Sequence, residues 1–196
     1  MEKIKKDTIK KKTLIPVVVT LIGALLMVLC VFLPYSTATE ERTEWIDKYP
    51  DTVVLEGMQL TAADMKNISL AQYAHIYFTM SEEFWHDSSV GTLYVVLVAL
   101  IGGGVAVATI FVLGRKPIGC MIFGGLACGV FHLLNLDFID RGVILSDSYD
   151  WGIAHTLFPI AAVILAGGAL WLLVMKVNLK KQLKAMVSTA TETVSE

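Results

Sequence analysis

Charged residues are scarce in this chain, and four long stretches contain none. Asp, Glu, Lys and Arg make up 17% of its 196 residues, and they are absent from 14–35, 90–113, 117–135 and 152–175. A helix of about 20 apolar residues crosses the hydrocarbon core of a bilayer. Lipid cannot hydrogen-bond to the backbone, so such a stretch is expected to be helical. The composition therefore excludes an ordinary soluble domain and predicts four membrane-spanning helices.

Cysteine is also scarce, and none occurs in an aqueous segment. The chain has three cysteines, Cys30, Cys120 and Cys128, and all of them lie in the apolar stretches. A disulfide framework or a thiol oxidoreductase needs reactive cysteines in its loops. We exclude both classes and interpret the three thiols as small apolar packing residues.

The sequence contains no complete catalytic, metal-binding or nucleotide-binding motif. Its four histidines, His75, His86, His132 and His155, are not spaced as HxH, HxxxH or HExxH. A pair of metal ligands on one element requires such a spacing. We therefore expect no metal, no other cofactor and no nucleic-acid partner.

The distribution of charge predicts how the chain is oriented in the membrane. Twelve of the sixteen basic residues lie in 1–13, 114–116 and 176–196, whereas 36–89 and 136–151 hold 14 of the 18 acidic residues. Lys and Arg are enriched in cytoplasmic loops. We expect a multi-pass protein of the cell membrane with both termini and the short turn in the cytoplasm, and with the two acidic segments outside.

The first apolar stretch has a second interpretation as a cleaved signal peptide. A lysine-rich start and small residues at Ser36 and Ala38 suit signal peptidase. Its apolar run of about 21 residues, however, is longer than the 7–15 of an ordinary signal sequence. We expect 14–35 to be retained as an anchor, with cleavage as the alternative.

The segment 36–89 is long enough to fold in water. Its residues 37–40, Thr-Ala-Thr-Glu, resemble a capping box and predict a short helix to about Lys48, which Pro50 would end. Residues 51–60 are expected to be extended, with a break at Gly57.

A second capping box, from Ser69 to Gln72, predicts a helix over about 69–86. An apolar stripe along this helix indicates that it lies over the outer ends of the spans or, less favourably, on the membrane surface. Polar and interfacial aromatic side chains of this helix are our candidates for binding a partner. They are Tyr73, His75, Tyr77, Glu82, Glu83 and Trp85.

Small residues are concentrated in the second and third apolar stretches. Only 114–116 separates the two stretches, so they must be antiparallel neighbours. Glycines let helix backbones approach closely in lipid. We expect packing within the chain through the following glycines, with a homo-oligomer as the alternative: Gly102, Gly103, Gly104, Gly125 and Gly129.

Polar residues at membrane depth gather near the outer ends of the third and fourth stretches. Imidazole and carboxylate groups can bind a metal or carry a proton, and buried polar groups need partners. We expect a structural hydrogen-bond network first and a ligand or proton site second. The residues concerned are His132, Asn135, Asp137, Asp150 and His155.

Short tails, a large first outer loop and a smaller second one resemble claudin-like tetraspan proteins in topology. The Gly-Leu-Trp signature and cysteine pair of the claudin loop are absent, so the resemblance implies no junction or pore. The sequence Phe-Leu-Pro-Tyr-Ser at 32–36, the acidic loop after it and Trp-Gly-Ile-Ala at 151–154 look like small four-helix membrane proteins of Gram-positive bacteria. That resemblance implies no particular activity.

These observations predict an all-α fold, an integral membrane four-helix bundle with a partly helical extracytoplasmic segment. The leading functional hypothesis is a non-enzymatic accessory subunit whose acidic outer face binds a membrane or extracytoplasmic protein. A small transporter or channel component is second, although ion coupling usually needs an ionisable group inside the bilayer and the predicted spans contain no carboxylate or lysine. A membrane-embedded lipid-acting enzyme is third and would depend on the groups around His132 and His155.

Overall fold

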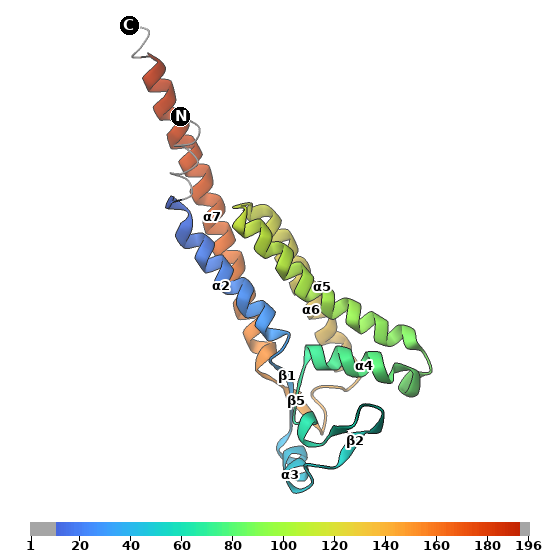
Figure 1. Ribbon diagram of the computed structural model, residues 1–196. Helices are drawn as coiled ribbons and strands as arrows, with labels where there is room; N and C mark the ends of the chain where they lie inside the picture. Colours follow the sequence, from blue (N-terminus) through green and yellow to red (C-terminus); the bar gives the residue numbers. More distant parts are fainter. Residues whose placement is uncertain (1–10, 193–196) are drawn as a thin grey trace.

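The computed structural model describes residues 11–192 of the chain, and this part is mostly helical (Figure 1). Two helices, α3 and α4, are short and lie in the segment between the first and second apolar stretches. The helices are α2 (Leu14–Cys30), α3 (Glu40–Lys48), α4 (Leu70–Trp85), α5 (Ser88–Leu113), α6 (Pro117–Asp140) and α7 (Ile153–Glu192).

Short strands correct the all-α prediction. β1 (Pro34–Ala38) is the centre of an antiparallel sheet of order β4–β1–β5, with β4 (Asn67–Ser69) and β5 (Tyr149–Trp151) at its edges. β2 (Val53–Leu55) and β3 (Leu60–Thr61) form a hairpin in the segment that was expected to be extended. The first span was predicted to continue to residue 35 because β1 follows an apolar run without a break in hydrophobicity.

Three helices, α5, α6 and α7, are long and apolar enough to cross a membrane. Their outward faces are apolar, as lipid contact requires; Val163, for example, is 72% exposed. α2 is also apolar, but its 17 residues are fewer than the roughly 20 that a bilayer core requires. Four membrane spans were predicted. Three helices of the structure have the length and composition of a span.

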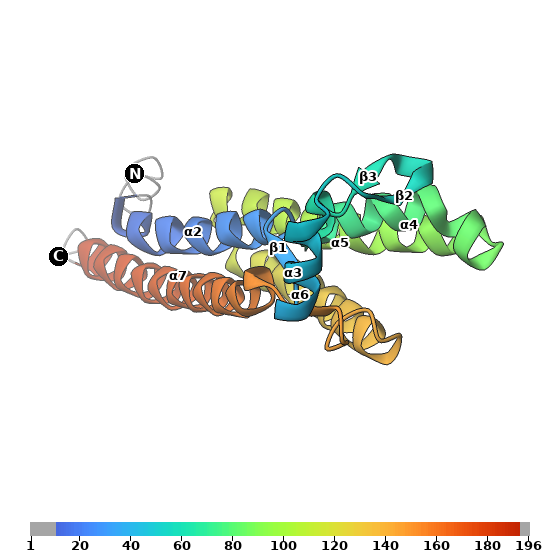
Figure 2. The same cartoon turned by 90° about the horizontal axis from the view of Figure 1, so that it is seen from below.

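The long helices pack as two pairs that diverge toward one end of the molecule (Figure 1). α2 lies along α7, and α5 lies against α6. The strands, α3 and α4 are located at the diverging end, and we call them together the cap domain. Figure 2 shows α4 alongside the cap-proximal half of α5.

Close backbone contact joins α2 to α7. A Cβ atom added at Gly23 would lie 2.5 Å from the Leu165 nitrogen and 2.8 Å from the Ala161 oxygen. A Cβ atom added at Gly168 would lie 2.5 Å from the Thr20 hydroxyl. That hydroxyl is buried and donates a hydrogen bond of 2.6 Å to the Pro16 oxygen. The two glycines therefore allow α2 and α7 to approach to a distance that a larger residue would prevent.

The glycines predicted to join α5 and α6 do not, with one exception, make that contact. The two helices are neighbours, but a Cβ atom added at Gly102, Gly103, Gly125 or Gly129 would meet nothing within 4 Å. Gly104 does face the partner helix, where an added Cβ atom would lie 3.4 Å from that of Ala127. Gly125 and Gly129 are four residues apart, a GxxxG spacing that places them on one face of the helix. This spacing does not determine the direction in which that face points.

α4 begins at the predicted capping box and packs on α5. The Ser69 hydroxyl accepts a hydrogen bond from the Gln72 backbone nitrogen, and the Gln72 side chain accepts one from the Ser69 nitrogen, at 3.2 and 2.8 Å. Near the middle of α4, a Cβ atom added at Gly91 of α5 would overlap the Tyr77 carbonyl oxygen. The prediction that this helix docks on the protein's own helices is confirmed.

Candidate functional site

Four tyrosines meet where the cap domain joins the long helices. Tyr35 comes from β1, Tyr73 and Tyr77 from α4, and Tyr94 from α5. Their rings surround Phe138 of α6, with centroid distances between 4.9 and 6.0 Å. All five side chains are buried. We call these five residues the tyrosine cluster.

Hydrogen bonds from the tyrosine cluster tie the cap domain to the long helices. The Tyr35 hydroxyl donates to the Asn135 side-chain oxygen at 2.6 Å. The Tyr94 hydroxyl donates to one oxygen of Asp137, and the other oxygen of Asp137 accepts from Arg141 Nε at 2.9 Å. These bonds therefore link β1 to α6 and α5 to α6.

The tyrosine cluster also fixes α4 against the sheet. The Tyr73 hydroxyl shares a hydrogen bond of 2.7 Å with the buried Ser36 hydroxyl. Burial raises the pKa of Tyr35 and Tyr73 well above the usual range and raises the pKa of Tyr77 to about 12. These hydroxyls are therefore protonated at neutral pH, so they can donate hydrogen bonds.

The five residues predicted to form a polar site are not brought together. Asn135 and Asp137 bind the tyrosine cluster, but His132 is exposed on α6. Asp150 is exposed on β5, because side chains alternate along a strand and its two neighbours point inward. His155 is half-buried and stacks on Trp151 at a centroid distance of 3.8 Å. Within residues 11–192, no group of three or more His, Cys, Asp and Glu side chains could hold a metal ion.

The predicted partner-binding residues divide into two groups. Tyr73 and Tyr77 are buried in the tyrosine cluster, so their side chains are not exposed to a partner in this structure. His75, Glu82 and Glu83 are exposed on α4 and remain available. The side chain of Trp85 lies outside the part that the structure describes.

Sequence reasoning missed five residues of the site: Tyr35, Ser36, Tyr94, Phe138 and Arg141. Tyr35 and Tyr94 lie in apolar stretches and were counted as parts of spans, although a tyrosine near the end of a span is a signal for a polar partner. Arg141 lies four residues after Asp137, the spacing of an ion pair on one helix face. That spacing indicates that α6 continues beyond residue 135, as it does.

No protein family matches the chain, and comparison with curated proteins and with solved structures gives no match. The function is therefore argued from the geometry of the molecule.

Two recesses open on the cap domain on either side of Met65 and Ile68. The larger, of about 410 Å³, lies between Tyr73 and the loop 142–149. The smaller, of about 130 Å³, lies between the β2–β3 hairpin and α4, next to His75. The tyrosine cluster meets the larger recess through Tyr73, whereas no member of the cluster lines the smaller one.

Exposed carboxylates occur on two chain segments that are bonded to each other in the cap domain. Thr39 at the start of α3 binds the loop before β5, where its hydroxyl donates to the Asp147 backbone oxygen at 2.8 Å. This bond joins the loop that carries Asp147 to the start of α3, where the first turn is acidic. We call these exposed carboxylates the acidic face: Glu40, Glu41, Glu44 and Asp147.

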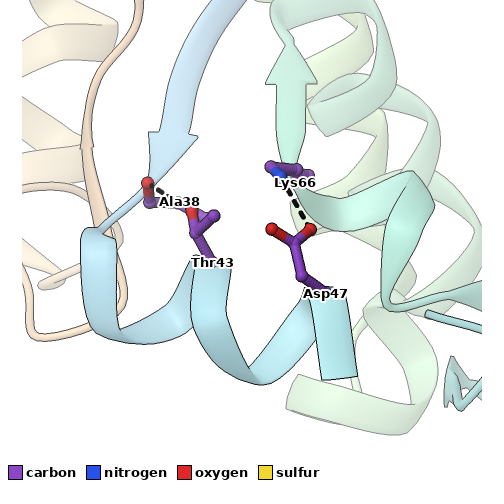
Figure 3. Close-up of polar contacts among 4 residues, drawn as sticks. All are labelled: Ala38, Thr43, Asp47 and Lys66. Atoms are coloured by element: carbon purple, nitrogen blue, oxygen red, sulfur yellow. Dashed lines mark hydrogen bonds and ion pairs between the residues drawn. The ribbon is translucent and has the colours of Figure 1, made fainter. Parts of the chain in front are cut away.

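α3 is held firmly on the sheet, so the acidic face is part of a folded surface. Ile46 is 1% exposed and packs with Ala38 and Ala62. Figure 3 shows Thr43 donating to the Ala38 oxygen at 3.3 Å and Lys66 paired with Asp47 at 2.7 Å. Lys66 neutralises Asp47, which lies at the opposite end of α3 from Glu40.

Proposed function

We propose that this protein is a non-enzymatic membrane protein that binds a protein partner through the acidic face, as an accessory subunit of a membrane or envelope complex. The proposal rests on one observation: the Thr39 to Asp147 hydrogen bond joins α3 and the loop before β5 on a folded domain, and both segments carry exposed carboxylates. The two segments that form the cap domain and its loop hold 14 acidic and 4 basic residues. A partner with a Lys- and Arg-rich surface complements this charge.

In the proposed orientation the cap domain lies outside the cell and both termini lie in the cytoplasm. The basic residues at the opposite end of the molecule support this orientation. We further propose that α2 is a fourth membrane crossing, because Gly23 brings it into backbone contact with α7 and its apolar sequence continues to Leu33.

Two alternatives find less support. An enzyme needs a nucleophile paired with a base, or a metal, in its site. The hydroxyls of Tyr35, Tyr73 and Tyr94 are instead hydrogen-bonded to Asn135, Ser36 and Asp137, and none of these pairs has the form of an activated nucleophile. A transporter needs an ionisable group that exchanges its partner within the bilayer. Asp137 lies in the last turn of α6 and is bonded to both Tyr94 and Arg141, which favours a structural role.

Photo-crosslinking in native membranes tests the proposed partner site. A photoreactive residue in place of Glu44 should give an adduct with a defined protein, and the E40Q/E41Q/D147N variant should lose this adduct. Glutamine and asparagine keep the size of the side chain and remove only its charge. The adduct should also weaken with added salt, because the attraction between exposed charges is screened.

The matched control is E56Q/E82Q/E83Q, which removes three exposed charges of the cap domain outside the acidic face. It should keep the adduct. Glu40 and Glu41 also stabilise the first turn of α3 through the helix dipole, so neutralising each one should lower the stability of the protein by roughly 0.3–1 kcal/mol. The two variants are therefore compared at equal thermal stability and abundance. An adduct that both variants lose equally, or no adduct at Glu44, would contradict the proposal.

A further inference from the structure

A third pocket lies at the end of the molecule opposite the cap domain. It has a volume of about 290 Å³ and is formed by the start of α6 and one face of α7. Three lysines and three apolar residues define its chemistry: Lys116, Lys176, Lys180, Ile118, Leu173 and Val177. No acidic side chain lines it.

The sequence explains why basic and apolar groups share this pocket. Residues 173, 176, 177 and 180 are three or four positions apart, so they lie on one face of α7. Ile118 follows Pro117 at the first turn of α6, where the apolar stretch begins. The pocket therefore lies at the boundary between the apolar part of the helices and their basic end.

Hydrogen bonds hold the basic groups in place around the α5–α6 turn. Lys176 Nζ donates to the Arg115 carbonyl oxygen at 2.6 Å, and Arg115 Nε donates to the Thr13 hydroxyl at 3.1 Å. Three cations thus line the pocket, one from the turn and two from α7, and Arg115 lies next to them in the turn. The sequence has no Asp or Glu between Asp87 and Asp137 or between Asp150 and Glu192, so α5, the body of α6 and this part of α7 supply no counter-ion.

We propose that this pocket binds an anionic phospholipid, with its phosphate between Lys116 and Lys180 and an acyl chain along Ile118, Leu173 and Val177. A phospholipid places its phosphate at the level where an apolar helix meets water, which is the level of these lysines. Long lysine side chains at such a boundary direct their ammonium groups to the headgroup region. The positive end of the α6 dipole adds to the attraction. A soluble anion would pair with the lysines but would make no favourable contact with Ile118, Leu173 and Val177. The mixed lining of the pocket therefore favours a lipid.

Lipid-dependent thermal stability of the full chain in nanodiscs tests the proposal. Wild-type protein should unfold at a higher temperature in phosphatidylglycerol than in phosphatidylcholine. Each lysine close to the headgroup strengthens binding about fivefold, so K116Q/K180Q should weaken phosphatidylglycerol binding about 25-fold. Native mass spectrometry of the detergent-solubilised protein should show one retained phosphatidylglycerol molecule in wild type and none in the variant.

K181Q/K184Q is the matched control, because it removes two exposed lysines of α7 that do not line the pocket. It should behave as wild type. Equal phosphatidylglycerol binding by both variants would show a general charge effect and overturn the proposal, as would equal stabilisation by inorganic phosphate. The single variant K180Q, with an expected fivefold loss, gives the same comparison if K116Q/K180Q unfolds in phosphatidylcholine.

Discussion

The hydroxyl of Tyr35 donates a 2.6 Å hydrogen bond to the side chain of Asn135, and both residues are buried. Tyr35 lies in the central strand of the cap-domain sheet and Asn135 lies in α6. The two bonded residues are 100 positions apart in the sequence. Their bond therefore joins the strand that follows α2 to α6.

Replacing Tyr35 with Phe should destabilise the protein by about 1–3 kcal/mol, because the buried Asn135 oxygen loses its donor. The free energy of unfolding in mild detergent measures this cost. Y35F/N135L should cost less than the sum of the single variants, because it removes both partners of the bond. Additive effects would show that the bond contributes nothing beyond the packing of each side chain.

Substitution of glycine should distinguish the two helix pairs. Gly23→Leu or Gly168→Leu places a side chain against the backbone of the partner helix and should cost about 1–3 kcal/mol or more. Gly125→Leu and Gly129→Leu add the same side chain where no atom lies within 4 Å, so they serve as controls and should leave the melting temperature nearly unchanged. A greater loss at Gly125 than at Gly23 would contradict the observed packing.

The tyrosine cluster should make stability fall at alkaline pH. Burial raises the pKa of Tyr77 to about 12, against about 10 in an unfolded chain. The folded protein then favours the neutral phenol, so this contribution is complete below about pH 10 and is lost as the pH rises from there toward 12. Melting temperatures at pH 8, 10 and 11 measure the loss.

Tyr77→Phe isolates this effect from the titration of lysines, which occurs over the same range. The variant should have a smaller decrease in melting temperature between pH 10 and 11 than wild type. If the tyrosinate absorbance that Tyr77→Phe removes had its midpoint near pH 10 in the folded wild-type protein, Tyr77 would not be buried as described.

Local signals explain which parts of the fold were predictable. The capping box at Ser69 and Gln72 specifies where α4 begins, and the three-residue turn before Pro117 makes α5 and α6 neighbours. Tyr73 and Tyr77 lie on the apolar stripe of α4 that was expected to dock on the spans, so their burial follows from the spacing. Their contact with Phe138 was not predictable, because the local pattern does not specify the partner of the stripe.

The features that sequence reasoning missed depend on distant contacts. β1 pairs with strands about 30 and 115 residues away, and its five residues are too few to show a strand period next to an apolar run. The rotation of α6 decides that Asn135 points inward and His132 outward. That rotation depends on packing against α5 and α7, which no local pattern specifies.

Single-cysteine labelling tests the orientation of the chain, which rests on the distribution of its basic residues. Ser88 and Asp147 are exposed at the cap-domain end, and Lys181 is exposed at the basic end. Cysteines at Ser88 and Asp147 should react with a membrane-impermeant maleimide in intact cells. A cysteine at Lys181 should react only after the membrane is opened.

The three native cysteines lie in helices that pack in the apolar part of the molecule, and two of them are fully buried, so the background should be low. A variant with all three replaced by Ala provides the matched parent for the labelling series. If Lys181→Cys were labelled in intact cells while the other two were protected, the cap domain would face the cytoplasm. Its acidic face would then have to bind a cytoplasmic partner, and the pocket of Lys116, Lys176 and Lys180 would lie in the outer leaflet. This one measurement therefore decides on which side of the membrane both proposed sites act.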